Sequence, residues 1–81
     1  MMTKSSEYSR LMTLNQRVKN NTANKAEKDE LFELLYKHGH ISKKQYEDYQ
    51  KGRNIEDVVN AAVVIAGIVL LGHILGQIGN A

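Results

Sequence analysis

The hydrophobic and polar positions divide the chain into two parts of different character. Up to Asp57, apolar residues recur at spacings of three and four among charged and polar residues, whereas residues 58–81 carry no formal charge. Spacings of three and four place apolar side chains on one face of a helix. The pattern therefore predicts an all-α fold with a short N-terminal amphipathic helix, a helical hairpin and one long hydrophobic C-terminal helix.

Residues 1–23 form a basic segment with four basic residues and one acid. Tyr8, Leu11, Leu14 (or Asn15) and Val18 lie at helical spacing, which predicts a short helix near residues 5–19. Such a helix can pack on the rest of its own domain, or it can bind a membrane surface or a partner. We favour packing on its own domain.

Residues 24–53 contain the signals of a helical hairpin. Asn24 with Glu27, and Ser42 with Gln45, have the spacing of capping boxes, in which two side chains satisfy free N–H groups at the start of a helix. A glycine follows each predicted helix, where a left-handed residue ends a helix. The residues predicted to pack the hairpin are Leu31, Leu34, Leu35, Ile41, Tyr46 and Tyr49.

The hairpin also has a recognisable order of residues. It contains the run Leu31-x-x-Leu34-Leu35-x-x-x-Gly39-x-Ile41-Ser42-x-x-x-Tyr46-x-x-Tyr49. This run resembles the SHOCT (short C-terminal) helical hairpin over roughly residues 27–51. The resemblance implies an interaction or oligomerisation element beside membrane segments or other domains, without catalysis. In this chain a hydrophobic helix follows the hairpin, whereas the family's hairpin usually ends its chain.

The uncharged C-terminal part predicts a membrane-spanning helix. Asn54, followed by Glu56 and Asp57, predicts a third helix N-cap with acids at the positive end of the helix dipole. From Val58–Ile78 a helix would be about 31 Å long, which matches a hydrocarbon core of roughly 30 Å. We therefore expect residues 54–81 to form one helix that spans a bilayer.

Basic residues precede this helix and none follows it. The positive-inside rule then places the N-terminal part of the chain in the cytoplasm. The expected localisation is therefore the membrane, with a single pass and a cytoplasmic N-terminus. The flanking basic residues are Lys43, Lys44, Lys51 and Arg53.

The predicted spanning helix has two different faces. One face is small or polar, and the opposite one carries large aliphatic side chains. Because lipid gives helices no hydrophobic drive to associate, small residues that allow close contact favour association. We expect a homo-oligomer or docking on another membrane subunit. The residues of this helix-packing or pore-lining face are Ala62, Ala66, Val69, Gly72, His73, Gly76, Gln77 and Asn80.

His73 is the ionisable residue of the predicted span. Ionisable residues inside membranes usually face protein or water and are often functional. In an oligomer, a ring of His73 side chains with Gln77 would line a narrow path that responds to pH. The simpler interpretation, which we favour, is a neutral imidazole with one hydrogen bond between helices. His38 and His40 lie at a turn, and we expect both to be exposed to solvent.

Composition excludes several classes of function. The 81 residues contain no Cys, which rules out disulfides, thiolate metal sites and a cysteine nucleophile. No phosphate-binding loop and no catalytic pairing of side chains can be assembled from the sequence. We therefore expect no enzyme activity, no cofactor and no metal ion. Acids dilute the basic residues of the polar part, so a nucleic acid partner is not expected.

Three functions fit these observations. The first is a non-enzymatic single-pass membrane protein that forms homo-oligomers through the small face, with a pore as one outcome. The second is a minor subunit of a larger membrane assembly, including a membrane-containing virus particle. The third is a soluble helical oligomer or interaction module in which the hydrophobic helix forms a core shared among chains.

Overall fold

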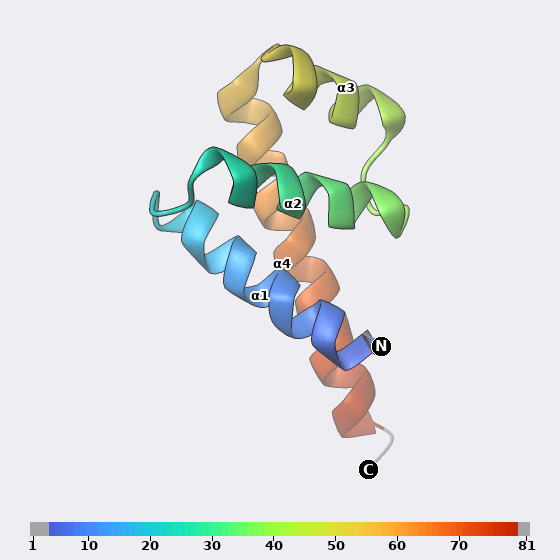
Figure 1. The fold of residues 1–81 in the computed structure, drawn as a ribbon. Helices are drawn as coiled ribbons and strands as arrows, with labels where there is room; N and C mark the ends of the chain where they lie inside the picture. The colour runs from blue at the N-terminus through green and yellow to red at the C-terminus, as the bar shows by residue number, and fades with distance from the viewer. Residues whose placement is uncertain (1–3, 80–81) are drawn as a thin grey trace.

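The computed structural model describes residues 4–79, and in that range the chain forms helices and no strand. This confirms the predicted all-α fold with a long hydrophobic C-terminal helix. The helices are α1 (Lys4–Lys19), α2 (Lys25–Lys37), α3 (Lys43–Lys51) and α4 (Ile55–Gly79), shown in Figure 1.

The starts of α2 and α3 have the predicted caps. The side chain of Asn24 accepts a hydrogen bond from the backbone N–H of Glu27 at 2.8 Å, and the Glu27 side chain accepts one from the Asn24 N–H at 3.0 Å. Ser42 and Gln45 form the same reciprocal pair, at 3.1 and 2.8 Å. Both capping boxes are therefore confirmed, and each satisfies two N–H groups at a helix start.

Two glycines end α2 and α3 in the left-handed region. Gly39 has φ 75° and Gly52 has φ 70°. After each glycine, a backbone N–H bonds back to a carbonyl of the preceding helix: His40 to Leu35 at 2.8 Å, and Arg53 to Asp48 at 2.8 Å. Glycine adopts this φ without the strain that a side chain would add. A left-handed residue cannot continue an α-helix, so each helix ends at its glycine.

The start of α4 differs from the prediction. Asn54 has φ 47°, in the left-handed region, whereas a capping residue has an extended backbone. Its carbonyl accepts the first helical bond, from the N–H of Val58 at 2.9 Å. The predicted side-chain cap is therefore wrong. Only three residues separate α3 from α4, and Asn tolerates the left-handed region well enough to make the sharp turn between them.

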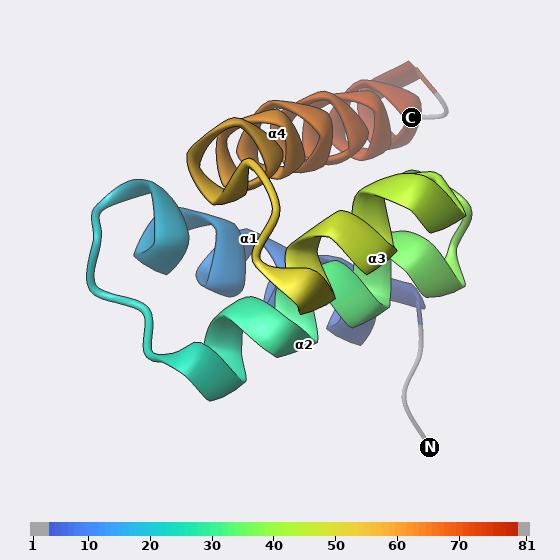
Figure 2. The same ribbon diagram turned by 90° about the horizontal axis from the view of Figure 1, so that it is seen from above.

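The four helices form two layers with α4 on one side. Figure 2 shows α4 alone on one side of the molecule and α1, α2 and α3 on the other. α1 packs against α2 and α4, and α3 also packs against both of these helices. In Figure 1 the first turns of α1 lie beside the later turns of α4, so the two helices run in opposite directions.

The hydrophobic core lies between these layers. α1, α2 and α4 each contribute buried side chains, and Ile41 adds one from the turn before α3. Leu14, Leu31 and Leu35 have no exposed surface. The core residues are Leu11, Leu14, Val18, Leu31, Phe32, Leu35, Ile41, Ala62 and Ala66.

Candidate functional site

The inner face of α4 packs against the rest of the chain. Ala62 is 1% exposed and Ala66 is fully buried, and both belong to the same cluster as Leu11, Leu14 and Val18 of α1. Val69 is partly buried against this cluster. Because alanine side chains are short, they let the backbones of the two helices approach closely.

Ion pairs hold α1 onto α2 beside this contact. The guanidinium of Arg10 donates two hydrogen bonds of 2.7 Å to the carboxylate of Glu30, and Arg17 lies 2.7 Å from Glu27. The Arg10 bonds hold the pKa of Glu30 below its ordinary value, because they favour the charged carboxylate. These pairs join α1 to α2 beside the buried contact through which α1 covers the inner face of α4.

His73 lies at the far end of the same contact. Its ring stacks on the ring of Tyr8, with centroids 3.7 Å apart and planes 12° from parallel. Glu7 directly precedes Tyr8. Its carboxylate lies 2.7 Å from Nε2 of His38 and 3.9 Å from the ammonium of Lys37. The polar start of α1 therefore joins the last turn of α2 to the later part of α4.

The outer face of α4 carries large aliphatic side chains with no partner in the described part of the chain. Val64 is 60% exposed, Ile68 65%, and Leu71 and Leu75 57% each. These four residues, here called the ridge, lie at spacings of four, three and four, so they form one line along the helix. The ridge points away from α1, α2 and α3, because it is opposite the buried alanines.

The structure divides the predicted packing face. It brings Ala62, Ala66, Val69 and His73 together on the side that contacts α1, and it leaves Gly72 exposed. Gly76 and Gln77 belong to α4, but the structure does not describe their surroundings, and Asn80 lies outside the described residues.

The hairpin side chains predicted to pack do lie in or against the core. Leu31, Leu35 and Ile41 are buried, whereas Leu34, Tyr46 and Tyr49 are partly buried against the same cluster. Tyr49 stacks on Phe32 at 3.8 Å between centroids. The basic residues before α4 lie on the surface: Lys43, Lys44 and Lys51 pair with acids of α3, and Arg53 is exposed.

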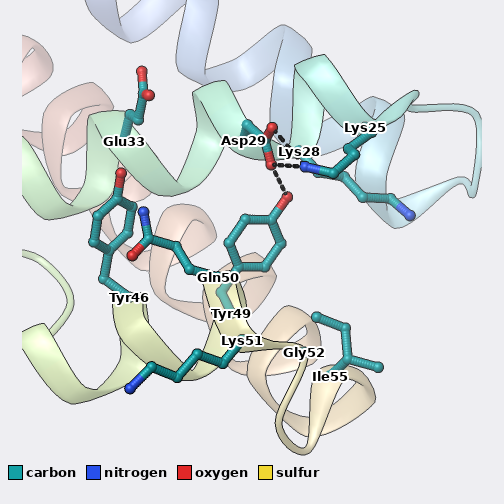
Figure 3. A pocket seen from close by; sticks show the side chains of 10 residues that line it. All are labelled: Lys25, Lys28, Asp29, Glu33, Tyr46, Tyr49, Gln50, Lys51, Gly52 and Ile55. Atoms are coloured by element: carbon teal, nitrogen blue, oxygen red, sulfur yellow. Dashed lines mark hydrogen bonds and ion pairs between the residues drawn. The ribbon is translucent and has the colours of Figure 1, made fainter.

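An open groove of about 680 Å³ lies between α2 and α3 (Figure 3). On its wall, Asp29 accepts hydrogen bonds from the Tyr49 hydroxyl at 2.5 Å and from the Lys25 ammonium at 3.0 Å. These bonds lower the pKa of Asp29, and the bond from Tyr49 has the larger effect. Burial, followed by the hydrogen bond to Asp29, raises the pKa of Tyr49. The ammonium groups of Lys28 and Lys51 point away from Asp29. The groove therefore offers a carboxylate that is already engaged, and no converging set of charges.

Other features of the described residues offer little chemistry. His38 and His40 are exposed, as predicted. Within residues 4–79, no group of three His, Asp or Glu side chains is placed to hold a metal ion. A small cavity of about 20 Å³ lies beside Tyr8 and Val69, with room for about one water molecule.

Two contacts of the site are absent from the sequence-based predictions. The stacking of Tyr8 on His73 joins residues 65 positions apart, and no local pattern indicates it. The pairing of Arg10 with Glu30 is also long-range. A partial signal for α1 exists, because Leu11, Leu14 and Val18 lie at helical spacing and all three are buried.

Comparison with known proteins adds no further assignment. No family model matches the chain, and neither a curated protein nor a solved structure gives a significant match. The resemblance of residues 27–51 to the SHOCT hairpin therefore stays a prediction.

Proposed function

We propose that this protein is a small, non-enzymatic, single-pass membrane protein whose α4 is the membrane element. The observation that carries the proposal is the exposure of an apolar segment. Ile55–His73 is long and apolar enough to cross a membrane, yet only 11% of it is buried within the chain. A helix of this kind in the core of a soluble protein is mostly buried, so the exposure favours an environment other than water.

The ridge provides a driving force for this transfer. Moving its four side chains from water into hydrocarbon is worth about 4–7 kcal/mol, given how much of each is exposed. The backbone of α4 satisfies its own hydrogen bonds, as a segment in lipid must. The basic residues before α4 favour a cytoplasmic N-terminus.

The contact between α1 and α4 sets a condition on this function. α1 runs beside α4 as far as His73 and carries Arg10 and Arg17, whose charges are costly in the bilayer core. α4 can therefore span a membrane only after it separates from α1. A buried polar atom lowers the cost of that step: Oδ1 of Asn15 has no hydrogen-bond partner among the described residues, and such an atom costs about 1–3 kcal/mol.

Separation from α1 would uncover the inner face of α4. Ala62, Ala66 and His73 would then be free to contact α4 of other copies, because small residues favour close helix packing in lipid. The inserted form is thus a homo-oligomer through this face, and a pore lined by His73 is its permeabilising form. In the folded form described here, α1 takes the place of the other copies.

One observation favours a second candidate, the soluble oligomer with α4 as shared core. The Arg10–Glu30 and Arg17–Glu27 pairs join the charged helix α1 to α2, and α1 also packs against α4. In that candidate, α1 never leaves, and the ridges of several copies shield one another from water.

Extraction of membranes with alkaline carbonate tests the proposal. We expect the full chain, expressed alone, to stay in the carbonate pellet and to be released by detergent. Ile68→Lys should move it to the supernatant, since a lysine at the centre of a span costs about 3 kcal/mol. Gln16→Lys adds the same charge to an exposed position of α1 and should leave the pellet unchanged. Full release of the unmodified chain by carbonate would reject the membrane span and support the soluble oligomer.

A further inference from the structure

The ridge is symmetric about its own centre. Val64 and Leu75 lie at equal distances from the point between residues 69 and 70, and so do Ile68 and Leu71. At about 100° per residue, the two members of each pair also lie at equal angles on either side of the middle line of the ridge. A second copy turned end over end therefore presents an identical surface in the same register.

Two glycines flank the ridge with the same symmetry. Gly67 lies on one flank and Gly72 on the other, at equal distances from the centre, and both are exposed. A side chain on either would meet nothing within 4 Å in the described residues. Each glycine weakens the helix by about 1 kcal/mol relative to alanine, so the folded chain gains nothing from them. Glycines in such a position are typical of a close approach by another helix.

The glycines fit the ridge of an antiparallel second copy. Ile68 lies on the same flank as Gly72, and Leu71 on the same flank as Gly67. When the partner helix is reversed about the common centre, Ile68 comes level with the Gly72 position of the second copy, and Leu71 with its Gly67 position. Large side chains then enter the spaces left by glycines, as in knobs-into-holes packing.

Charge selects the antiparallel direction. Asp57 lies two helical turns before Val64, on the same line as the ridge. A parallel pair would place the two Asp57 carboxylates against each other, whereas the antiparallel pair places each beyond the last turn of the partner helix. Two ridges in contact remove somewhat less than about 1,000 Å² from water, which is the size of a weak, concentration-dependent interface.

We propose that the ridge of α4 binds the ridge of a second copy of this chain in an antiparallel, two-fold contact while α1 covers the inner face. The two-fold axis lies in the interface between the two helices, level with the point between residues 69 and 70 of each. This dimer belongs to the folded form described above, and it does not depend on the entry of α4 into a bilayer.

Disulfide cross-linking tests the contact, because the natural chain has no cysteine. Val64→Cys and Leu75→Cys chains are produced separately and together in cells, and the whole lysate is oxidised before it is fractionated. In the antiparallel dimer two Val64 positions lie about 16 Å apart along the axis, beyond the reach of a disulfide. We therefore expect dimers only when both variants are present.

Each other outcome overturns the proposal. Dimers from each variant alone would show a parallel pair, and the absence of dimers from any combination would show that no second copy occupies the ridge. Gln16→Cys, at an exposed position of α1, serves as the position that should give no dimer. Chains that also carry Gly67→Leu and Gly72→Leu should yield at least about tenfold less dimer, the equivalent of 1.4 kcal/mol, while helical content by circular dichroism is unchanged. The cross-linking experiment decides only the dimer through the ridge, and the carbonate extraction decides only the membrane span of α4. Either proposal can therefore fail without the other.

Discussion

The two faces of α4 reverse the usual distribution of side chains by size. Its inner face buries Ala62 and Ala66, two of the smallest side chains, while its outer face exposes Val64, Ile68 and other large aliphatic residues. In soluble proteins large aliphatic side chains are the ones most often buried. The difference indicates that the inner face is built for close contact with another helix, and that the outer face is built for surroundings less polar than water.

The two faces also differ in how they are held. Core side chains from α1 and α2, together with ion pairs between those helices, determine what the inner face touches. The ridge of the outer face has no such determinant within the described residues. Substitutions on the inner face should therefore act mainly by changing the packing within the chain. Substitutions on the ridge should act mainly by changing the association of the chain with other molecules.

Matched leucine substitutions should give the largest contrast. Leu14→Ala removes a fully buried side chain next to the inner face and should lower the free energy of unfolding by about 2–5 kcal/mol. Leu71→Ala removes the same atoms from the ridge. It should change the free energy of unfolding by less than about 0.5 kcal/mol at concentrations where the chain is monomeric. Denaturant unfolding followed by circular dichroism measures both. Equal losses would show that the ridge is buried in the folded chain after all.

A substitution that adds volume should give the next largest effect. Ala66→Leu has no room between α4 and α1 and should lower the free energy of unfolding by about 1–3 kcal/mol through overpacking. Val64→Leu adds volume on the exposed face and serves as its control, with no loss expected. Thermal unfolding monitors both variants, and a neutral Ala66→Leu would mean that α1 does not rest on this face.

The local structure of residues 24–53 could be predicted from sequence because its signals are local. Each capping box joins residues three positions apart, and each glycine lies directly after the helix that it ends. The wrong prediction at Asn54 has the same origin, since Asn suits both an N-cap and a left-handed turn. The short connection between α3 and α4 decides between these roles, and residue type alone does not.

The packing of α1 on its own domain, which the sequence favours, is confirmed, but the position of α1 over α4 could not be predicted, because it depends on long-range contacts. The periodicity of α4 separates a small face from a large one, but it does not say which chain covers the small face. α1 has an apolar face of only Leu11, Leu14 and Val18 and therefore gives a weak pattern. Its position follows from pairs such as Arg10–Glu30 and Tyr8–His73, which join distant parts of the sequence.

The helix caps should contribute less than the core. Asn24→Ala and Ser42→Ala each remove a side-chain acceptor from a capping box, and each should lower the free energy of unfolding by about 1 kcal/mol. Asn54→Ala is the matched control, because its side chain caps nothing in the described residues; it should act only through the strain of a left-handed alanine. Denaturant unfolding ranks the three variants. A loss of 3 kcal/mol or more at Ser42 would indicate a role beyond capping.

The smallest expected effect is a dependence of stability on acid pH. The pKa of Asp29 lies below its ordinary 3.8, chiefly because the Tyr49 hydroxyl donates to it, and Arg10 lowers the pKa of Glu30. A carboxyl with a lowered folded pKa stabilises the fold at pH values above its unfolded pKa, and this contribution is lost as pH falls through the folded pKa. Stability should therefore be constant from neutral pH to about 5 and decline below about 4.

Tyr49→Phe separates the hydrogen bond from the packing in this acid dependence. Phenylalanine keeps the ring stacked on Phe32 but cannot donate to Asp29, so the folded pKa of Asp29 should rise toward its ordinary value. The decline in stability between about pH 4 and pH 2 should then be shallower than in the natural chain, because a smaller difference in pKa remains between the folded and unfolded states. Acid titration of the denaturation midpoint measures this slope. Parallel curves for the two chains would show that Lys25 alone controls Asp29, and that Tyr49 joins α3 to α2 only through its ring.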